Sequence, residues 1–279
     1  MFKNLVKSFK KSRTLNVIKS YITFVPKRIR IVLSTLVTLF VLVFSTFFPF
    51  IESWYFFVIA IIFVSAISTY FAIFEGVDGV EWYMLFIVPI FFALTMYFTY
   101  TLFPARWLTR LPFIILFSLG YYAVLLTMNI FNVGVTKSIQ LYRAAFSINY
   151  ISQTFIVFLL SLVILSFRFP FFIAGILLFI SAFMLSLQLF WSVNLESKLN
   201  KNLYLSSLVL SLIIIQLISL ITFVPLEINI VALVLSGTYY SISGIIYHSL
   251  SERLFKNTVR EYVFVLIFIL LISLFTLSQ

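Results

Sequence analysis

The chain has 279 residues, of which 63% are hydrophobic and only 10% are charged, and its formal net charge is +11. An ordinary soluble domain is about half apolar and about a quarter charged, so this chain cannot cover its apolar surface with its own polar side chains. The composition excludes a water-soluble globular protein and predicts one whose surface is covered by a lipid bilayer. With no cysteine in the sequence, disulfides, thiolate catalysis and cysteine-bound metals are also excluded.

Residues 1–30 form a basic segment that holds nine of the 19 lysines and arginines. On a helix, four of its apolar side chains share one face among four lysines: Phe2, Leu5, Val6 and Phe9, with Lys3, Lys7, Lys10 and Lys11. Such a helix suits an anionic lipid surface, where each cation contributes about 1 kcal/mol. A segment that only sets the orientation of the chain is the alternative interpretation. We expect no nucleic-acid partner, because the positive charge is not gathered on a soluble domain.

Beyond residue 30 the sequence breaks into nine apolar blocks. Each has about 20 residues, the length that crosses a hydrocarbon core of about 30 Å as an α-helix. A transmembrane β-barrel would instead show alternating segments of about ten residues. The prediction is therefore an all-α, polytopic transmembrane helix bundle over residues 31–279. The expected spans are 31–50, 54–74, 83–103, 111–131, 145–167, 171–193, 203–223, 227–248 and 262–278.

The distribution of cations predicts the orientation, because lysine and arginine next to a span stay on the cytoplasmic side. With nine spans, sixteen of the 19 cations share the side of the N-terminus, and only Arg106, Arg110 and Arg168 lie on the other side. An eight-span arrangement, in which the first two blocks form a re-entrant hairpin, would move seven more cations to the far side. The count therefore favours nine spans with a cytoplasmic N-terminus.

The connection at 75–81 is acidic, with Glu75, Asp78 and Glu81 among the eight acidic residues of the chain. Three carboxylates so close together suit a hard cation, although calcium loops place their ligands more densely. The nine-span arrangement puts them on the same side as Lys137 and Arg143, which predicts an electrostatic contact between the two clusters. A polar turn that separates two spans is the alternative.

The predicted span at 145–167 is the most polar of the nine. Asn149 and Gln153 are four residues apart and therefore share a helical face. Amides within a span usually join helices by hydrogen bonds worth about 0.6 kcal/mol each. A solute pathway lined by these amides is the alternative interpretation.

The predicted span at 227–248 has a polar face at alternating spacings of four and three, with two glycines beside it: Ser236, Tyr240, Ser243 and Tyr247, then Gly237 and Gly244. Small residues at this spacing let helices approach closely, so close packing is one interpretation and a polar substrate face is the other. His248, the only histidine, ends this span near the membrane interface, where a capping or snorkelling role is expected.

The sequence lacks the motifs of the common catalytic mechanisms. One histidine without cysteine excludes helical zinc motifs and Cys–His dyads, and the seven scattered glycines form no GxGxxG, Walker A or GxSxG sequence. No predicted span has an ionisable residue at its centre, whereas proton relays and most ion-coupled pumps need one. We therefore expect no cofactor, no metal ion and no catalytic residue, although an intramembrane enzyme stays open.

Three segments carry a resemblance to known proteins: EGVDGVEWYMLFIVP at 75–89, FPARWLTRLPF at 103–113 and LTMNIFNVGVTKSIQLYRAAFS at 126–147. They are similar to an uncharacterised family of multi-pass membrane proteins from candidate-phyla bacteria, over the middle half of the chain. The resemblance implies the bacterial cytoplasmic (inner) membrane. It implies no activity and no residue roles.

These observations leave two main classes of function. The first is a non-catalytic scaffold or a subunit of an envelope complex, with another membrane protein as its partner. The second is a transporter, channel or lipid-handling protein that uses the polar spans. A cavity lined by the candidate polar residues of the fifth and eighth spans favours the second class, whereas a dry bundle with an exposed face of small residues favours the first.

Overall fold

The computed structural model describes residues 26–48, 50–74, 82–103, 107–133, 139–195, 200–252 and 254–277. These residues form nine α-helices and no strand: α3 (Lys27–Ser45), α4 (Phe50–Ile73), α5 (Met84–Thr101), α6 (Trp107–Val133), α7 (Ile139–Ser166), α8 (Phe171–Trp191), α9 (Lys201–Ile221), α10 (Ile228–Leu250) and α11 (Lys256–Leu277). All nine are long and apolar enough to cross a membrane. The predicted all-α, polytopic fold with nine spans is confirmed, and the cytoplasmic N-terminus stays a prediction.

The helices extend beyond the predicted apolar blocks at some of their charged ends. α3 begins at Lys27 and not at residue 31, and α7 begins at Ile139 and not at residue 145. Lysine and arginine have long aliphatic stems, so a helix can continue through them while their charges stay in the interface. Pro26 and Pro170 directly precede α3 and α8, where a residue without an N–H group leaves no helical hydrogen bond unmade.

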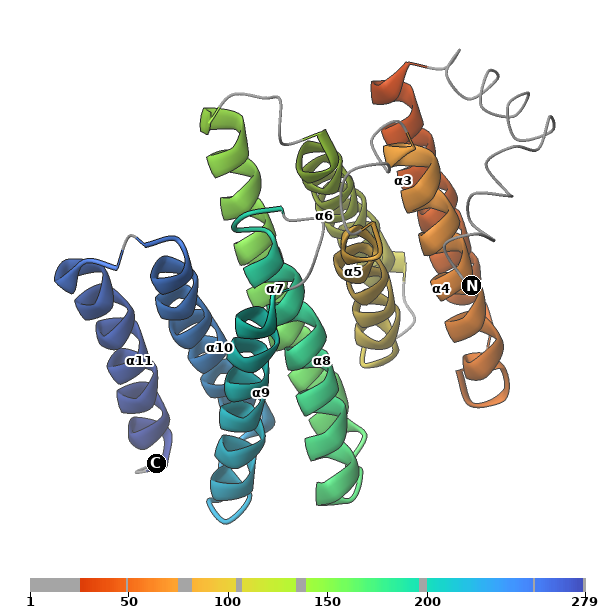
Figure 1. Cartoon of the computed structure of the whole chain (residues 1–279). Coiled ribbons are helices and arrows are strands. Elements are labelled where there is room, and N and C mark those ends of the chain that lie inside the picture. Colours follow the sequence, from red (N-terminus) through yellow and green to blue (C-terminus); the bar gives the residue numbers. More distant parts are fainter. Residues whose placement is uncertain are drawn as a thin grey trace, which may run out of the picture.

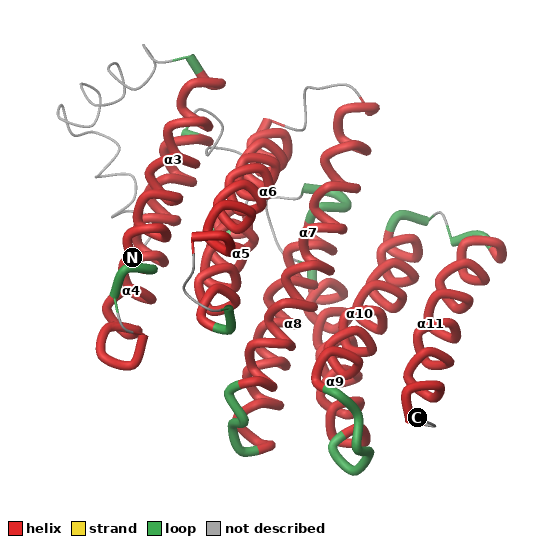
Figure 2. Tube along the Cα trace, turned by 180° about the vertical axis from the view of Figure 1, so that it is seen from behind, coloured by secondary structure: helices red, strands yellow, loops and turns green. Residues whose placement is uncertain are grey.

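The helices follow one another across the bundle roughly in chain order, from α3 and α4 at one edge to α11 at the other (Figures 1 and 2). α7 packs against α5, α6, α8 and α10, and therefore joins the earlier helices to the later ones. α5 and α10 are the most buried spans, whereas only 6% of the α11 span is buried. α11 packs mainly on α10 and forms the outer edge of the bundle.

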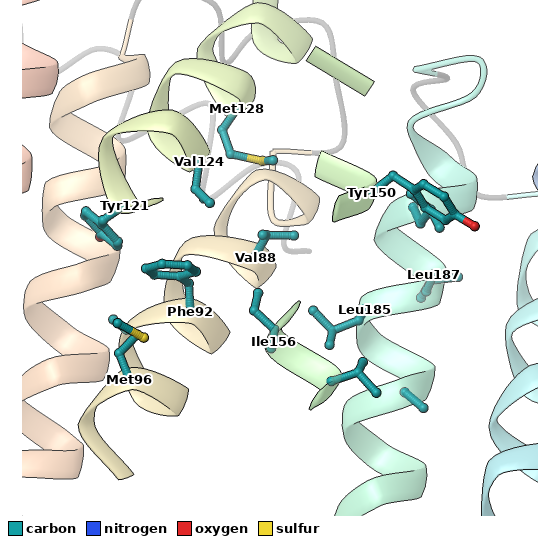
Figure 3. Close-up of a cluster of buried hydrophobic side chains, with 14 of the residues drawn as sticks. Val88, Phe92, Met96, Tyr121, Val124, Met128, Tyr150, Ile156, Leu185 and Leu187 are labelled. Atoms are coloured by element: carbon teal, nitrogen blue, oxygen red, sulfur yellow. The ribbon is translucent and has the colours of Figure 1, made fainter. Parts of the chain in front are cut away.

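An apolar core shared by α5, α6, α7 and α8 fills the centre of the bundle (Figure 3). Its buried side chains include Val88, Phe92, Tyr121, Met128 and Leu185. A Cβ at Gly120 would overlap the ring of Phe92, so glycine at this position lets α5 and α6 approach closely. Helix association in lipid depends on such packing, because lipid tails are as apolar as the side chains themselves.

Small hydroxyl residues add hydrogen bonds between the first helices. Ser34 of α3 donates a hydrogen bond of 2.9 Å to the carbonyl oxygen of Ser68 in α4. The hydroxyl of Ser65 in α4 lies 3.0 Å from the hydroxyl of Tyr121 in α6. Because all of these side chains are buried, the bonds join three helices in a region without competing water.

Arg110 has a structural role that is independent of the side of the membrane on which it lies. Its Nε donates a hydrogen bond of 3.0 Å to the hydroxyl of Tyr100, and its Nη2 donates one of 3.2 Å to the carbonyl of Thr46, directly after α3. Its guanidinium also lies 4.5 Å from the ring centroid of Phe47. A cation at a helix C-terminus satisfies carbonyls that the helix leaves open. Arg110 therefore ties the ends of α3 and α5 to the beginning of α6.

Candidate functional site

The first of two polar regions is sealed inside the bundle between α7, α8 and α10. Asn149 and Gln153 of α7 donate hydrogen bonds from their amide nitrogens to Gln188 Oε1 of α8, at 3.0 and 2.5 Å. Tyr239 of α10 donates from its hydroxyl to Gln153 Oε1 at 2.6 Å. All four side chains are buried, and we call them the sealed polar core.

The sealed polar core uses nearly all of its hydrogen-bonding groups. Gln188 Nε2 lies 3.7 Å from the sulfur of Met128 on α6, which is a weak acceptor. Asn149 Oδ1 has no partner among the described residues. Networks whose members are satisfied make a core rigid, whereas amides that line a solute pathway would be open to water. The geometry supports hydrogen-bonded joining of three helices at Asn149 and Gln153.

Sequence reasoning found two members of the sealed polar core and missed Gln188 and Tyr239. Gln188 is the only amide in α8, so an isolated polar residue in an apolar span was the available signal. Tyr239 stands next to Tyr240, and neighbouring residues on a helix point about 100° apart. Nothing in the sequence decides which of the two tyrosines faces the interior.

The second polar region is an open groove at the end of the bundle where α7 begins and α10 ends. It has a volume of about 460 Å³ and is lined by residues of α7, α10 and α11 and by Ser251, which directly follows α10. This volume lies within the range of small-molecule sites, about 300 to 1,000 Å³. Arg143 and His248 contribute nitrogen groups to the lining, and most of the other lining residues are aromatic. We call this region the polar groove.

Aromatic rings from three helices form the wall of the polar groove. Phe146 of α7 stacks on Tyr247 of α10, with ring centroids 3.7 Å apart and planes at 19°. The ring of Tyr240 lies 4.8 Å from that of Tyr150 on α7 and 5.5 Å from that of Tyr262 on α11. The Tyr150 hydroxyl donates to the backbone carbonyl of Tyr240, and Figure 3 shows it pointing away from the apolar core. The rings therefore pack on one another and give the wall a defined shape.

Two glycines of α10 determine how closely α11 approaches. A Cβ at Gly237 would overlap the side chain of Ile269, and a Cβ at Gly244 would overlap the ring of Tyr262. The two glycines are seven residues apart, as are Ile269 and Tyr262, so α10 and α11 meet along one seam. The seam holds Tyr262 against the polar groove. The structure therefore supports close packing at Gly237 and Gly244.

An apolar trough continues the polar groove deeper into the membrane-spanning part of the bundle. It has a volume of about 360 Å³ and lies between α7 and α10. Ile151 and Tyr240 line both the trough and the polar groove, so the two form one continuous groove. Thr154 and Ser236 also line the trough, but their hydroxyls donate to backbone carbonyls of their own helices. The trough therefore presents a mainly apolar surface.

The described candidate residues are divided between the sealed polar core and the continuous groove formed by the polar groove and the trough. Asn149 and Gln153 belong to the sealed polar core. Arg143 lines the polar groove, Ser236 lines the trough, and Tyr240 lies at their junction. The polar faces of the fifth and eighth spans thus serve two separate regions.

Four candidate residues lie outside the described part of the chain: Glu75, Asp78, Glu81 and Lys137. Asn132, near the end of α6, donates a hydrogen bond of 2.5 Å to the carbonyl of Ile73, the last residue of α4. The end of α4 and the end of α6 therefore lie next to each other. The electrostatic contact of the acidic cluster with Lys137 and Arg143 stays a prediction, as does the contact of the basic N-terminal segment with anionic lipid.

No protein-family model, curated protein or solved structure matches the chain. The resemblance of the central segments to a bacterial membrane-protein family therefore stays a prediction.

Proposed function

We propose that the chain is a lipid-handling membrane protein that binds an amphiphile in the continuous groove between α7 and α10. The observation that carries the proposal is the order of its two parts, with the polar groove at the end of the spans and the apolar trough deeper in. An amphiphile in a bilayer has the same order of head group and hydrocarbon chain. A small polar solute would leave the trough unfilled, and a purely apolar ligand would leave the charge of Arg143 unmatched.

The length of the groove suits a ligand that occupies one leaflet. Arg143 and Phe158 line its two ends on α7 and are 15 residues apart, about 22 Å along a helix axis. One leaflet contributes about half of a hydrocarbon core that is roughly 30 Å thick. The trough covers seven residues of this length on α7, from Ile151 to Phe158, or about 10 Å, so an acyl chain in it would stay within one leaflet with its head group in the polar groove.

The groove is open toward the surface that faces lipid. The side chain of Ile151, where the two parts meet, is 65% exposed. A ligand can therefore enter sideways from the bilayer without crossing the packed interior.

The other predicted functions have less support in these contacts. Asn149 and Gln153 bond to other side chains, which weighs against a polar solute pathway along that face of α7. The scaffold or envelope-complex subunit stays a prediction, because no described contact indicates a protein partner. Location in the bacterial cytoplasmic membrane is part of our proposal and rests on the cation distribution and the sequence resemblance.

Native mass spectrometry of protein purified in mild detergent tests the proposal. Ile151→Trp fills the junction of the groove and should remove most of the bound lipid. The matched control is Ile176→Trp on α8, a 54% exposed residue outside the groove, which should retain lipid like the wild type. Equal lipid retention in the two variants, or none in the wild type, would contradict the proposal.

A further inference from the structure

We infer that the polar groove recognises a lipid head group with a net negative charge, such as that of phosphatidylglycerol, through Arg143 and His248. The inference rests on the proposed binding of an amphiphile and adds the chemistry of its head group. Both side chains line the polar groove, which leads directly into the apolar trough. A single ligand can therefore contact these nitrogen groups and place its chain in the trough.

Arg143 and His248 are nitrogen groups in the polar groove that are available to donate to a ligand. Ser147 and Ser251 each donate a hydroxyl hydrogen bond of 3.1 Å to a backbone carbonyl four or three residues earlier in the chain, and Tyr150 donates to a carbonyl of α10. In contrast, neither the Arg143 guanidinium nor the His248 ring donates a hydrogen bond to any described residue. Arg143 is thus an available donor, and it carries the one full positive charge of the groove.

A comparison of two arginines shows why Arg143 is a candidate for ligand binding. Arg110 stabilises the fold, because it donates hydrogen bonds to Tyr100 and to the carbonyl of Thr46 and lies over the ring of Phe47. Arg143 lies at the rim of a groove, and within the described residues it has no ion-pair partner. A guanidinium carries five N–H donors in a planar fork that matches two oxygens of a phosphate or carboxylate.

A cationic head group suits the polar groove less well. Aromatic cages bind ammonium groups through open ring faces. Here Phe146 and Tyr247 stack on each other at 3.7 Å, and the rings of Tyr150 and Tyr240 are 4.8 Å apart, so these faces are largely covered. The aromatic wall therefore acts as a packed surface beside the charge of Arg143.

Glu261 is an acidic side chain close to His248 that a positive head group would approach. It lies on α11, interacts electrostatically with His248 and is exposed. A zwitterionic head group, with its phosphate at Arg143 and its amine at Glu261, is the closest alternative ligand. The experiment must therefore separate anionic from zwitterionic lipids.

The test compares two lipids with the same acyl chains, dioleoyl phosphatidylglycerol and dioleoyl phosphatidylcholine. Each is titrated into delipidated protein in detergent, and the bound fraction is measured by native mass spectrometry. We expect the wild type to bind the anionic lipid about tenfold more tightly. Both lipids offer a phosphate to Arg143, but the choline of phosphatidylcholine brings a second positive charge close to the guanidinium, and like charges placed together weaken binding. Arg143→Gln should remove this preference. Arg260→Gln, which removes an exposed arginine of α11 outside the groove, should keep it.

Each result either supports or overturns the inference. Equal affinities, or tighter binding of phosphatidylcholine, would overturn the anionic head group, as would an unchanged preference in Arg143→Gln. Inorganic phosphate forms a third arm, and if it binds as tightly as phosphatidylglycerol the ligand is a soluble anion and not a lipid. Ile151→Trp separates the two proposals. If Ile151→Trp blocks the binding of both lipids and the wild type shows no preference between them, only the head-group inference fails. If Ile151→Trp blocks the binding of neither lipid, the proposed function itself fails.

Discussion

Two helices, α7 and α10, contribute to both polar regions, of which one is closed and the other is open. In the sealed polar core, Gln153, Gln188 and Tyr239 match donors with acceptors across three helices. In the polar groove, Arg143 and His248 have no hydrogen-bond acceptor among the described residues. This difference shows that polar residues within a span do not by themselves indicate a binding site. An available donor at an accessible surface is the more useful sign.

The two regions are separated by the geometry of a helix. Asn149 and Tyr150 are neighbours in the sequence, and successive residues point about 100° apart. Asn149 therefore faces α8, whereas Tyr150 faces α10 and the wall of the polar groove. One helix can thus contribute to the stability of the bundle and to a ligand site without conflict.

The sealed polar core should be the more sensitive of the two regions. Gln153→Leu removes a bond to Gln188 and leaves the Tyr239 hydroxyl without its acceptor. Unsatisfied buried groups cost about 1 to 3 kcal/mol each, and interhelical bonds in membranes average about 0.6 kcal/mol. We expect a loss of about 2 kcal/mol in the free energy of unfolding, measured by denaturation in mixed micelles.

Two controls sharpen this prediction. Ser236→Ala in the trough should change the free energy of unfolding by less than about 0.5 kcal/mol. Adding Tyr239→Phe to Gln153→Leu should cost little more, because the two residues share one bond. Equal losses in the core and trough variants would mean that the sealed polar core is no more stabilising than the groove.

The seam between α10 and α11 should respond unequally to alanine at its two glycines. At Gly244 a new methyl group meets the ring of Tyr262 and lies 2.5 Å from the Tyr150 hydroxyl, and neither ring can move easily. At Gly237 it meets the flexible end of Ile269, which can rotate away. We expect Gly244→Ala to cost about 1 to 3 kcal/mol and Gly237→Ala less, as measured by thermal unfolding in detergent. The reverse order would contradict this description of the seam.

The two arginines should differ in their effect on stability. Arg110→Gln loses contacts to Tyr100 and to the end of α3, and should reduce the free energy of unfolding by about 1 kcal/mol. Arg143→Gln should have no measurable effect on the unfolding of lipid-free protein, since within the described residues it has no partner to lose. Thermal unfolding of both variants after delipidation makes this comparison. A loss at Arg143 as large as that at Arg110 would show that Arg143 serves the fold.

The transmembrane helices could be predicted from the sequence because their main signal, a long apolar block, is local. The apolar pattern predicts the start of α7 six residues too late, at 145, because Arg143 and other polar residues interrupt that pattern without ending the helix. The candidate sites depend on contacts that are not local. Gln188 is 35 residues from Gln153 in the sequence, and Tyr239 is 86 residues from it. Apolar pattern alone does not tell which helices become neighbours.

The polar groove, too, depends on helix contacts that the sequence does not reveal. The sequence indicates Ser236 and Tyr240 as polar residues of an apolar span and Arg143 as a partner of the acidic connection, and the structure puts all three along one groove. The aromatic wall and the contribution of α11 were not predicted. Phe146 and Tyr262 look like ordinary residues of apolar spans, and only the packing of α7, α10 and α11 brings their rings to the same wall.

Labelling with a photoactivatable lipid tests the central claim most directly. A phosphatidylglycerol with a photoreactive group in its acyl chain is added at low occupancy, and the labelled peptides are identified by mass spectrometry. The account predicts labelling concentrated on α7 and α10 around Ile151, Phe158 and Ser236, and its loss in Ile151→Trp but not in Ile176→Trp. Labelling spread evenly over the lipid-facing helices, including α3, α4 and α9, would contradict the account, because it would mean that lipid only surrounds the bundle.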